Sequence, residues 1–259
     1  MWKTTITKIE NEKIFVKGYD LTELMESCTF GDMVLLMATG KMPYLHQGEV
    51  MESILVACCD QGPIPPSTNA ARFVASCGVP LQAAVAAGLL GVGDHHGGAI
   101  EACAKLLQEN ILRDNESDYN ELAEKITKDF SDRKNRIPGF GHAYVEVDQR
   151  AVKLLEIARK KIHPYPHMEL LLAIEKKLTS EKGAHLAANI NGVVAAVISD
   201  LGVDWRMGKG IFIMSRSLGL IVHALEEMKL GRPYKKIPNE DIDYNGPEKR
   251  EVPIRLEPS

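Results

Sequence analysis

The stretch VPLQAAVAAGLLGVGDHHGGA, from Val79 to Ala99, decides how this chain is organised. Its first part consists almost entirely of small apolar residues, and a helix that is apolar on every side must be buried. Two interpretations stay open: a central core helix over 80–91, or a helix that also packs against its own copy across a two-fold axis. In either case the segment carries the polar sequence DHHGG to the junction with the next helix.

The histidine pair at this junction admits three interpretations. Gly97 and Gly98 permit a tight turn and the close approach of a ligand to the backbone. The dipole of the following helix disfavours a cationic imidazole, so a neutral His96 can donate a hydrogen bond to a carbonyl oxygen and stabilise an enolate. The alternatives are a structural histidine and a zinc ligand in a metal-binding helical protein. Because adjacent histidines diverge and no H-x-x-x-H or C-x-x-C spacing accompanies them, we expect no metal site.

The whole chain has the composition of an ordinary globular protein. Of its 259 residues, 45% are hydrophobic and 25% are charged, and the net charge is −4. This balance does not indicate nucleic acid or a membrane surface as a partner. No apolar run approaches the ~20 residues that span a bilayer, and the N-terminus MWKTTITKIENEK does not resemble a signal peptide. The five cysteines form no C-x-x-C pair, so we expect reduced thiols and a cytoplasmic location.

The hydrophobic pattern predicts an all-α protein with a short N-terminal β-hairpin. The segment TTITKIENEKIFVKG alternates polar and apolar residues around the turn-forming ENE. A period of 3.6 residues dominates the remainder, and glycine and proline separate the helical segments. The predicted helices are 20–28, 30–39, 47–59, 67–76, 80–91, 97–109, 117–131, 148–162, 167–181, 188–201 and 208–229.

Further candidate functional residues lie in RIPGFGH, in the following VDQRA and in IFIMSRSLGLIVHALEE. Pro138, Gly139 and Gly141 predict a rigid extended loop whose exposed backbone amides suit the edge of a flat heterocycle. Arg150, in the first turn of the next helix, can form a bidentate pair with a carboxylate. Arg216 interrupts an apolar helix, and a buried arginine needs an anionic partner. An internal salt bridge and a substrate carboxylate both stay open as that partner.

Taken in order, GDHHGGA, PGFGH with DQRA, NING and SRSLG resemble the motifs of the citrate synthase superfamily. The short length and the ending YKKIPNEDIDYNGP are most similar to citryl-CoA lyases and to the lyase module of ATP-citrate lyase. The resemblance covers roughly residues 18–245 and implies a mainly helical, dimeric fold with two domains that close over the substrates. We therefore expect a large domain of residues 1–98 and 209–259, and a small domain of residues 99–208.

The resemblance also implies roles for individual residues. His96 matches the histidine that stabilises the acetyl thioester enolate, and His142 matches the histidine at the oxaloacetate carbonyl or citryl hydroxyl. Arg150 and Arg216 match arginines that hold substrate carboxylates. Coenzyme A is expected as part of a thioester substrate or product, and no tightly bound cofactor is expected. The segment that matches the adenine-recognition loop of the family consists of Ile137, Pro138, Gly139, Phe140 and Gly141.

Three positions depart from the family pattern. In NING, Asn191 stands where the N-x-D-G motif has its catalytic aspartate, and an amide cannot take a proton from the acetyl methyl group. Since a positioned general base raises the reaction rate by about 10²–10⁴-fold, a condensing enzyme should retain it. Gln61 in DQG stands where a substrate-binding histidine is expected. GHA replaces the common G-H-R, so one basic residue for the coenzyme A phosphates is missing after His142, and Arg133, Lys134 or Arg136 can substitute for it.

The expected activity is cleavage of citryl-CoA to acetyl-CoA and oxaloacetate, in which only the final protonation needs the acid that Asn191 lacks. The alternatives are a citrate or methylcitrate synthase-like condensing enzyme, and a non-catalytic paralogue that binds coenzyme A or citrate as a partner or regulatory subunit. Asn191 is interpreted either as drifted chemistry or as an engineered Asp-to-Asn exchange. The expected partners are the coenzyme A thioester, citrate or oxaloacetate, a second copy in a homodimer or dimer of dimers, and a citryl-CoA synthetase.

Overall fold

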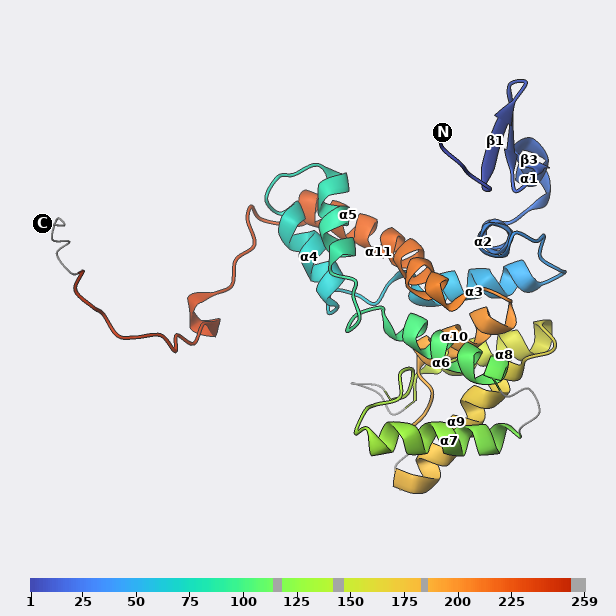
Figure 1. The fold of residues 1–259 in the computed structure, drawn as a ribbon. Helices are drawn as coiled ribbons and strands as arrows, with labels where there is room; N and C mark the ends of the chain where they lie inside the picture. Colours follow the sequence, from blue (N-terminus) through green and yellow to red (C-terminus); the bar gives the residue numbers. More distant parts are fainter. Residues whose placement is uncertain (114–117, 142–146, 183–185, 253–259) are drawn as a thin grey trace, which may run out of the picture.

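The computed structural model describes residues 1–113, 118–141, 147–182 and 186–252. These residues form eleven α-helices, two short 3₁₀-helices and a three-stranded sheet (Figure 1). The prediction of a mainly helical fold is confirmed, and each predicted helix is present. The helices are α1 Leu21–Ser27, α2 Phe30–Thr39, α3 Gln47–Cys59, α4 Pro66–Ala75, α5 Leu81–Leu90, α6 Ala99–Arg113, α7 Tyr119–Asp132, α8 Gln149–Lys161, α9 Pro166–Lys182, α10 Ile190–Asp200, η1 Trp205–Met207, α11 Gly208–Leu230 and η2 Asn239–Asp241.

The N-terminal hairpin is also confirmed, with one strand more than predicted. Strands β1 (Thr7–Glu10) and β2 (Lys13–Val16) pair antiparallel. Asn11 and Glu12, between them, have positive φ angles of 50° and 63°, as a two-residue hairpin turn requires. The third strand, β3 (Tyr19–Asp20), has only two residues, which is too short for an alternating pattern to reveal.

Helix α10 is buried along almost its whole length. Every residue from Gly192 to Ser199 is buried, and the helix packs against α6, α8 and α9. Because small and β-branched apolar residues cover all of its faces, α10 has no side that can face water. The polar residues of this segment are confined to its ends, with Asn189 and Asn191 at the start and Asp200 at the end.

Helix α5 is not the central core helix that one interpretation of its sequence predicted. Only Ala84 and Gly88 of α5 are buried within the chain, where the helix packs against α4 and α11. Leu90 at its end is 87% exposed. An all-apolar composition does not distinguish burial inside one chain from burial against another molecule, and in this chain α10 occupies the central position.

The long helix α11 runs from α4 and α5 to the middle of the helical body (Figure 1). It packs against α4 and α5 at one end, and also against α3 and α6. Helices α6 to α10 form a second group, in which α7 lies on α9 and α10 contacts α6, α8 and α9. Of the candidate functional residues, Arg216 lies on α11, and Arg150 and Asn191 lie in the first turns of α8 and α10. Gln61, His96 and the segment 137–141 lie in the connections that follow α3, α5 and α7. None of the described helices is both long enough and apolar enough to cross a membrane.

The packing of α5 on α4 can be tested by Gly88→Ala. An added Cβ would lie 2.8 Å from the carbonyl oxygen of Ser67 and 3.0 Å from Cβ of Ala71. Although alanine favours a helix by about 1 kcal/mol over glycine, we expect overpacking to lower the free energy of unfolding by about 1–3 kcal/mol in urea denaturation. Gly210→Ala, whose Cβ would meet nothing within 4 Å, should be neutral or stabilising. Equal effects of the two substitutions would contradict this close packing.

Candidate active site

His96 lies in a tight turn between α5 and α6. Its backbone N–H donates to the carbonyl of Gly93 over 3.0 Å, and its carbonyl accepts from the N–H of Gly93 over 2.9 Å. Gly97 follows with a φ of 86°. An added Cβ at Gly98 would lie 2.6 Å from Cα of Asp94, so the turn leaves no room for a side chain there. DHHGG therefore forms the predicted tight turn and holds His96 just before α6.

The imidazole of His96 is fixed by Ser67 and Phe212. Its Nε2 lies 2.8 Å from Oγ of Ser67, a fully buried residue in the first turn of α4. Its ring meets the ring of Phe212 edge-on, with centroids 5.6 Å apart. Burial, followed by the charge of Arg216, lowers the pKa of His96 below its usual 6.5. The imidazole is therefore neutral at neutral pH, and Nδ1 is the ring nitrogen turned away from Ser67.

Arg216 is buried in α11 and is only 1% exposed. Its Nε donates to the carbonyl of Cys58 over 3.1 Å, and its guanidinium lies 4.9 Å from the centre of the Phe212 ring. Burial lowers the pKa of this guanidinium. Its Nη1 is buried and has no hydrogen-bond partner within the described chain. The described residues thus supply no internal salt bridge for Arg216, and a buried cation of this kind calls for an anion.

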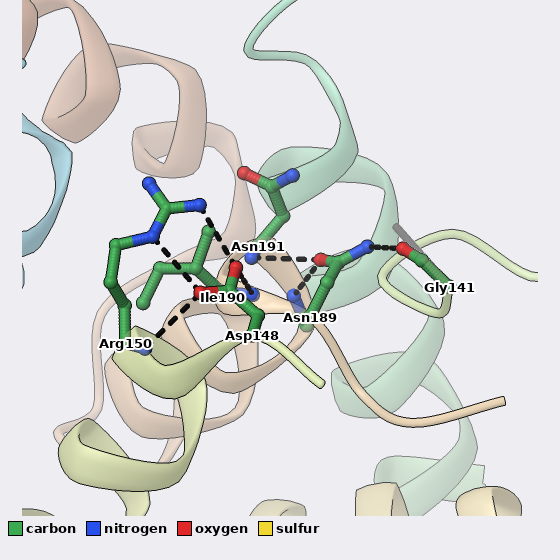
Figure 2. A network of polar contacts seen from close by, with 7 residues as sticks. Gly141, Asp148, Arg150, Asn189, Ile190 and Asn191 are labelled. Carbon is green, nitrogen blue, oxygen red and sulfur yellow. Dashed lines mark hydrogen bonds and ion pairs between the residues drawn. The ribbon is translucent and has the colours of Figure 1, made fainter. Parts of the chain in front are cut away.

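Arg150, by contrast, has an internal partner that sequence reasoning missed. Asp148, the N-cap of α8, accepts from Nε and Nη2 of Arg150 over 3.0 and 2.9 Å (Figure 2). Burial opposes ionisation of Asp148, but the hydrogen bonds and charge of Arg150 outweigh it and lower the pKa of the carboxyl. The predicted bidentate pair therefore forms with Asp148, which leaves the Nη1 side of Arg150 for a ligand. The signal was the aspartate two residues earlier in VDQRA.

Asn191 stands in the first turn of α10, in the network drawn in Figure 2. Its backbone N–H donates to Oδ1 of Asn189 over 2.9 Å. The preceding residue, Ile190, donates its N–H to Oδ2 of Asp148 over 3.2 Å. The side-chain amide of Asn191 extends away from Asn189 in this view. The first turn of α10 therefore lies beside the Asp148–Arg150 pair.

The loop 137–141 pairs antiparallel with residues 187–189. Two backbone hydrogen bonds of 2.9 Å, one at Gly139 and one at Gly141, flank the pairing of Phe140 with this segment. In such a ladder the backbone groups of the central residue point outward. The expectation of exposed amides is therefore wrong for Gly141, whose N–H bonds to the neighbouring segment, whereas the N–H and C=O of Phe140 turn away from it.

The same loop rests directly on α10. Gly139 has a φ of 90°, and an added Cβ would lie 2.7 Å from Cα of Gly192 and 2.9 Å from Sγ of Cys103. Ile137 is 8% exposed and belongs to the main hydrophobic core, while Pro138 is half-buried. The glycine of PGFG and the glycine of NING therefore allow these two segments to touch through their backbones.

Gln61 lies exposed in the connection between α3 and α4. The preceding residue, Asp60, accepts from the N–H of Gly62 over 3.1 Å, and its Oδ1 lies 3.0 Å from Nε2 of His223 in α11. The connection that carries Gln61 is thus tied to the helix that carries Arg216. The contact between Asp60 and His223 could not be predicted from local sequence, because the two residues are far apart along the chain.

His142 and the cations considered for the coenzyme A phosphates complete the set of predicted site residues. The predicted His142 lies outside the described residues. Of the cations considered for the coenzyme A phosphates, Arg133 is paired with Asp129 at 2.8 Å, and Lys134 and Arg136 are exposed. Within the described ranges, no group of three or more His, Cys, Asp or Glu side chains could hold a metal ion.

Residues 45–236 match the family described as citrate synthase, C-terminal domain, so the chain belongs to this family. A solved citryl-CoA lyase from Hydrogenobacter thermophilus is 35% identical, with a TM-score of 0.89 over 98% of both chains. An ATP citrate lyase from Methanothrix soehngenii, solved in complex with citrate and coenzyme A, has a TM-score of 0.84 and 23% identity over 96% of this chain and 42% of that one. The predicted family and fold are confirmed.

The curated relatives are longer proteins. The probable ATP-citrate synthase of Dictyostelium discoideum is 26% identical over 260 residues, which are 93% of this chain and 40% of that protein. The ATP-citrate synthase of Homo sapiens is 26% identical over 263 residues, or 95% of this chain and 23% of that protein. The chain thus spans less than half the length of these relatives.

The effect of Arg216 on His96 can be measured directly. Arg216→Met should raise the pKa of the His96 imidazole, because a nearby positive charge disfavours its protonation. We expect His96 of the parent to titrate below 6.5 in imidazole NMR spectra, and His96 of the variant to titrate at higher pH. Arg206→Met removes an exposed guanidinium paired with Asp204 and should leave this titration unchanged. Identical titration in parent and Arg216→Met would rule out the proposed proximity.

Proposed function

We propose that the chain cleaves citryl-CoA to acetyl-CoA and oxaloacetate. The observation that carries this proposal is the buried guanidinium of Arg216, whose Nη1 has no partner within the described residues. It lies against the same Phe212 ring as the neutral imidazole of His96. A citryl carboxylate would accept from Arg216 and compensate its charge. The likeness to a solved citryl-CoA lyase over 98% of both chains supports the same activity.

In the proposed reaction, the citryl hydroxyl gives its proton to His142. The bond between the carbinol carbon and the acetyl methylene then breaks, and its electron pair forms the enolate of acetyl-CoA while the hydroxyl oxygen becomes the carbonyl of oxaloacetate. His96 donates a hydrogen bond from Nδ1 to the enolate oxygen. Because the amide of Asn191 supplies no proton, the enolate carbon takes its proton from water, and the hydroxide that remains takes back the proton held by His142.

The two arginines are proposed to bind carboxylates in different ways. Arg216 keeps both Nη atoms for a ligand because its one bond to the protein backbone uses Nε. Arg150 offers its Nη1 side, since Asp148 accepts from Nε and Nη2. Gln61 is proposed to add a neutral hydrogen bond to the substrate in place of a charged histidine.

Coenzyme A is proposed to bind with its adenine along the loop 137–141. The outward N–H and C=O of Phe140 offer one donor and one acceptor to the edge of a flat heterocycle. Lys134 and Arg136, which are exposed at the start of this loop, are proposed to meet the phosphates.

We also propose how the chain is organised and assembled. A large domain of residues 1–98 and 209–259 and a small domain of residues 99–208 would close over the substrates.

A homodimer or dimer of dimers would cover the apolar surface of α5 and α11, where Leu90, Leu218 and Val222 are 87%, 59% and 57% exposed. A citryl-CoA synthetase is proposed to supply the substrate in the cytoplasm. Light scattering at micromolar concentration tests the assembly.

The release of oxaloacetate from citryl-CoA, followed in a coupled assay, tests the activity. We expect the parent to turn over and His96→Ala to lower kcat by about 10²–10⁴-fold, as the loss of an oxyanion donor does. Arg216→Ala should chiefly weaken the binding of citrate or oxaloacetate. Arg206→Ala is the matched surface control. A parent that bound coenzyme A in calorimetry but released no oxaloacetate would instead support a non-catalytic binding paralogue, the second candidate that Asn191 favours.

Asn191→Asp tests whether the missing carboxylate limits the reaction. Asparagine and aspartate are nearly isosteric, so the variant should fold normally and place an acid–base group in the first turn of α10. We expect citryl-CoA turnover and solvent-deuterium exchange into acetyl-CoA to rise together, by up to about 10²–10⁴-fold. Asn245→Asp, in the exposed C-terminal segment, is the control. A fall in turnover would indicate that the chemistry depends on a neutral amide.

A further inference from the structure

We infer that Asn189 is a positioning residue that fixes the loop 137–141 against α10 and so determines the affinity for coenzyme A. The inference rests on the proposed function. Its side chain bonds in two directions (Figure 2). Oδ1 accepts from the backbone N–H groups of Asn191 and Gly192 over 2.9 and 3.3 Å, and Nδ2 donates to the carbonyl of Gly141 over 2.6 Å. One side chain thus joins the first turn of α10 to the end of the loop.

The donor of Asn189 goes beyond what a helix cap requires. An N-cap side chain needs only an oxygen that accepts from the first turn, which aspartate, serine and threonine also supply. Among the described helices whose N-cap side chain accepts such a bond, α10 is the one with an amide, whose donor atom is separate from its acceptor oxygen. The other caps of this kind are Asp20, Thr29, Asp118, Asp148 and Asp204.

The additional bond goes to the carbonyl of Gly141, whose orientation the local backbone alone does not determine. Gly141 has a φ of 72°, in a region where glycine moves freely because it has no Cβ. The N–H of Gly141 is held by the segment 187–189, and its carbonyl is held by Nδ2 of Asn189. With both groups held, the outward edge of Phe140 has a fixed direction relative to α10.

The same turn of α10 is held on its other side by the arginine pair. Ile190 donates its N–H to Asp148, which in turn holds the guanidinium of Arg150. The N–H groups of the first three residues of α10 are thus bonded to Asp148 and Asn189, and the helix terminus is completed by the protein itself. The proposed adenine loop and a proposed carboxylate-binding arginine are therefore anchored to one helical turn that also carries Asn191.

Two substitutions distinguish the helix-capping bonds of Asn189 from its bond to Gly141. Asn189→Ser keeps a cap oxygen, but its shorter side chain has one hydroxyl in place of the separate amide that donates to Gly141. Asn189→Asp keeps the cap oxygen and places a carboxylate against the Gly141 carbonyl. We expect both variants to keep a Tm close to that of the parent. The Kd for coenzyme A in calorimetry should rise about twofold to tenfold in Asn189→Ser, the loss of one hydrogen bond, and further in Asn189→Asp. In the coupled assay, KM for citryl-CoA should rise more than kcat falls.

Thr29→Ala is the matched control, because it removes the N-cap side chain of a helix elsewhere in the chain. It should lower Tm without changing the Kd for coenzyme A. If Asn189→Ser bound coenzyme A as tightly as the parent, Asn189 would be a cap alone and the inference would be overturned. A parent that bound no coenzyme A, with or without oxaloacetate, would overturn the proposed function and this inference together.

Discussion

The burial of α10 on every face is the constraint on which the site depends. A helix that is apolar all round can lie in the core, but its first N–H groups have no partner within the helix and cannot reach water there. In this chain Asp148 and Asn189 supply the missing acceptors. Satisfying one helix end therefore brings the start of α8 and the loop 137–141 to the same place.

The two arginines near this helix end differ in how their positive charges are compensated. Asp148 compensates Arg150, whereas Arg216 has one backbone carbonyl and the face of Phe212 as its described partners. Burying an uncompensated charge costs several kcal/mol, so the site gains most from a ligand that brings negative charge. The same positive charge, added to burial, keeps the nearby His96 neutral. A neutral imidazole can then donate a hydrogen bond to a ligand oxygen.

Close backbone contacts explain why glycine stands at several positions around the site. Gly139 and Gly192 touch each other, and Gly98 touches the backbone of Asp94. A side chain at any of these positions would move a functional segment away from its support. These glycines therefore determine how near the loop and the His96 turn can come to the helices beside them.

The sequence by itself determined the helical segments, the hairpin and the tight turn at DHHGG, because each depends on residues close together in the chain. The order of the motifs was enough to indicate the family. The Asp148–Arg150 pair could also have been predicted from the sequence, because its two members stand two positions apart in VDQRA.

The tertiary structure alone decided which apolar helix is central and what surrounds each functional group. α5 and α10 are both apolar on all sides, and only packing shows that α10 is enclosed while α5 keeps an open surface. Ser67 reaches His96 from 29 residues away, and the carbonyl of Cys58 meets Arg216 across 158 residues. Such contacts depend on how helices cross, and periodicity along the chain carries no information about partners so far apart.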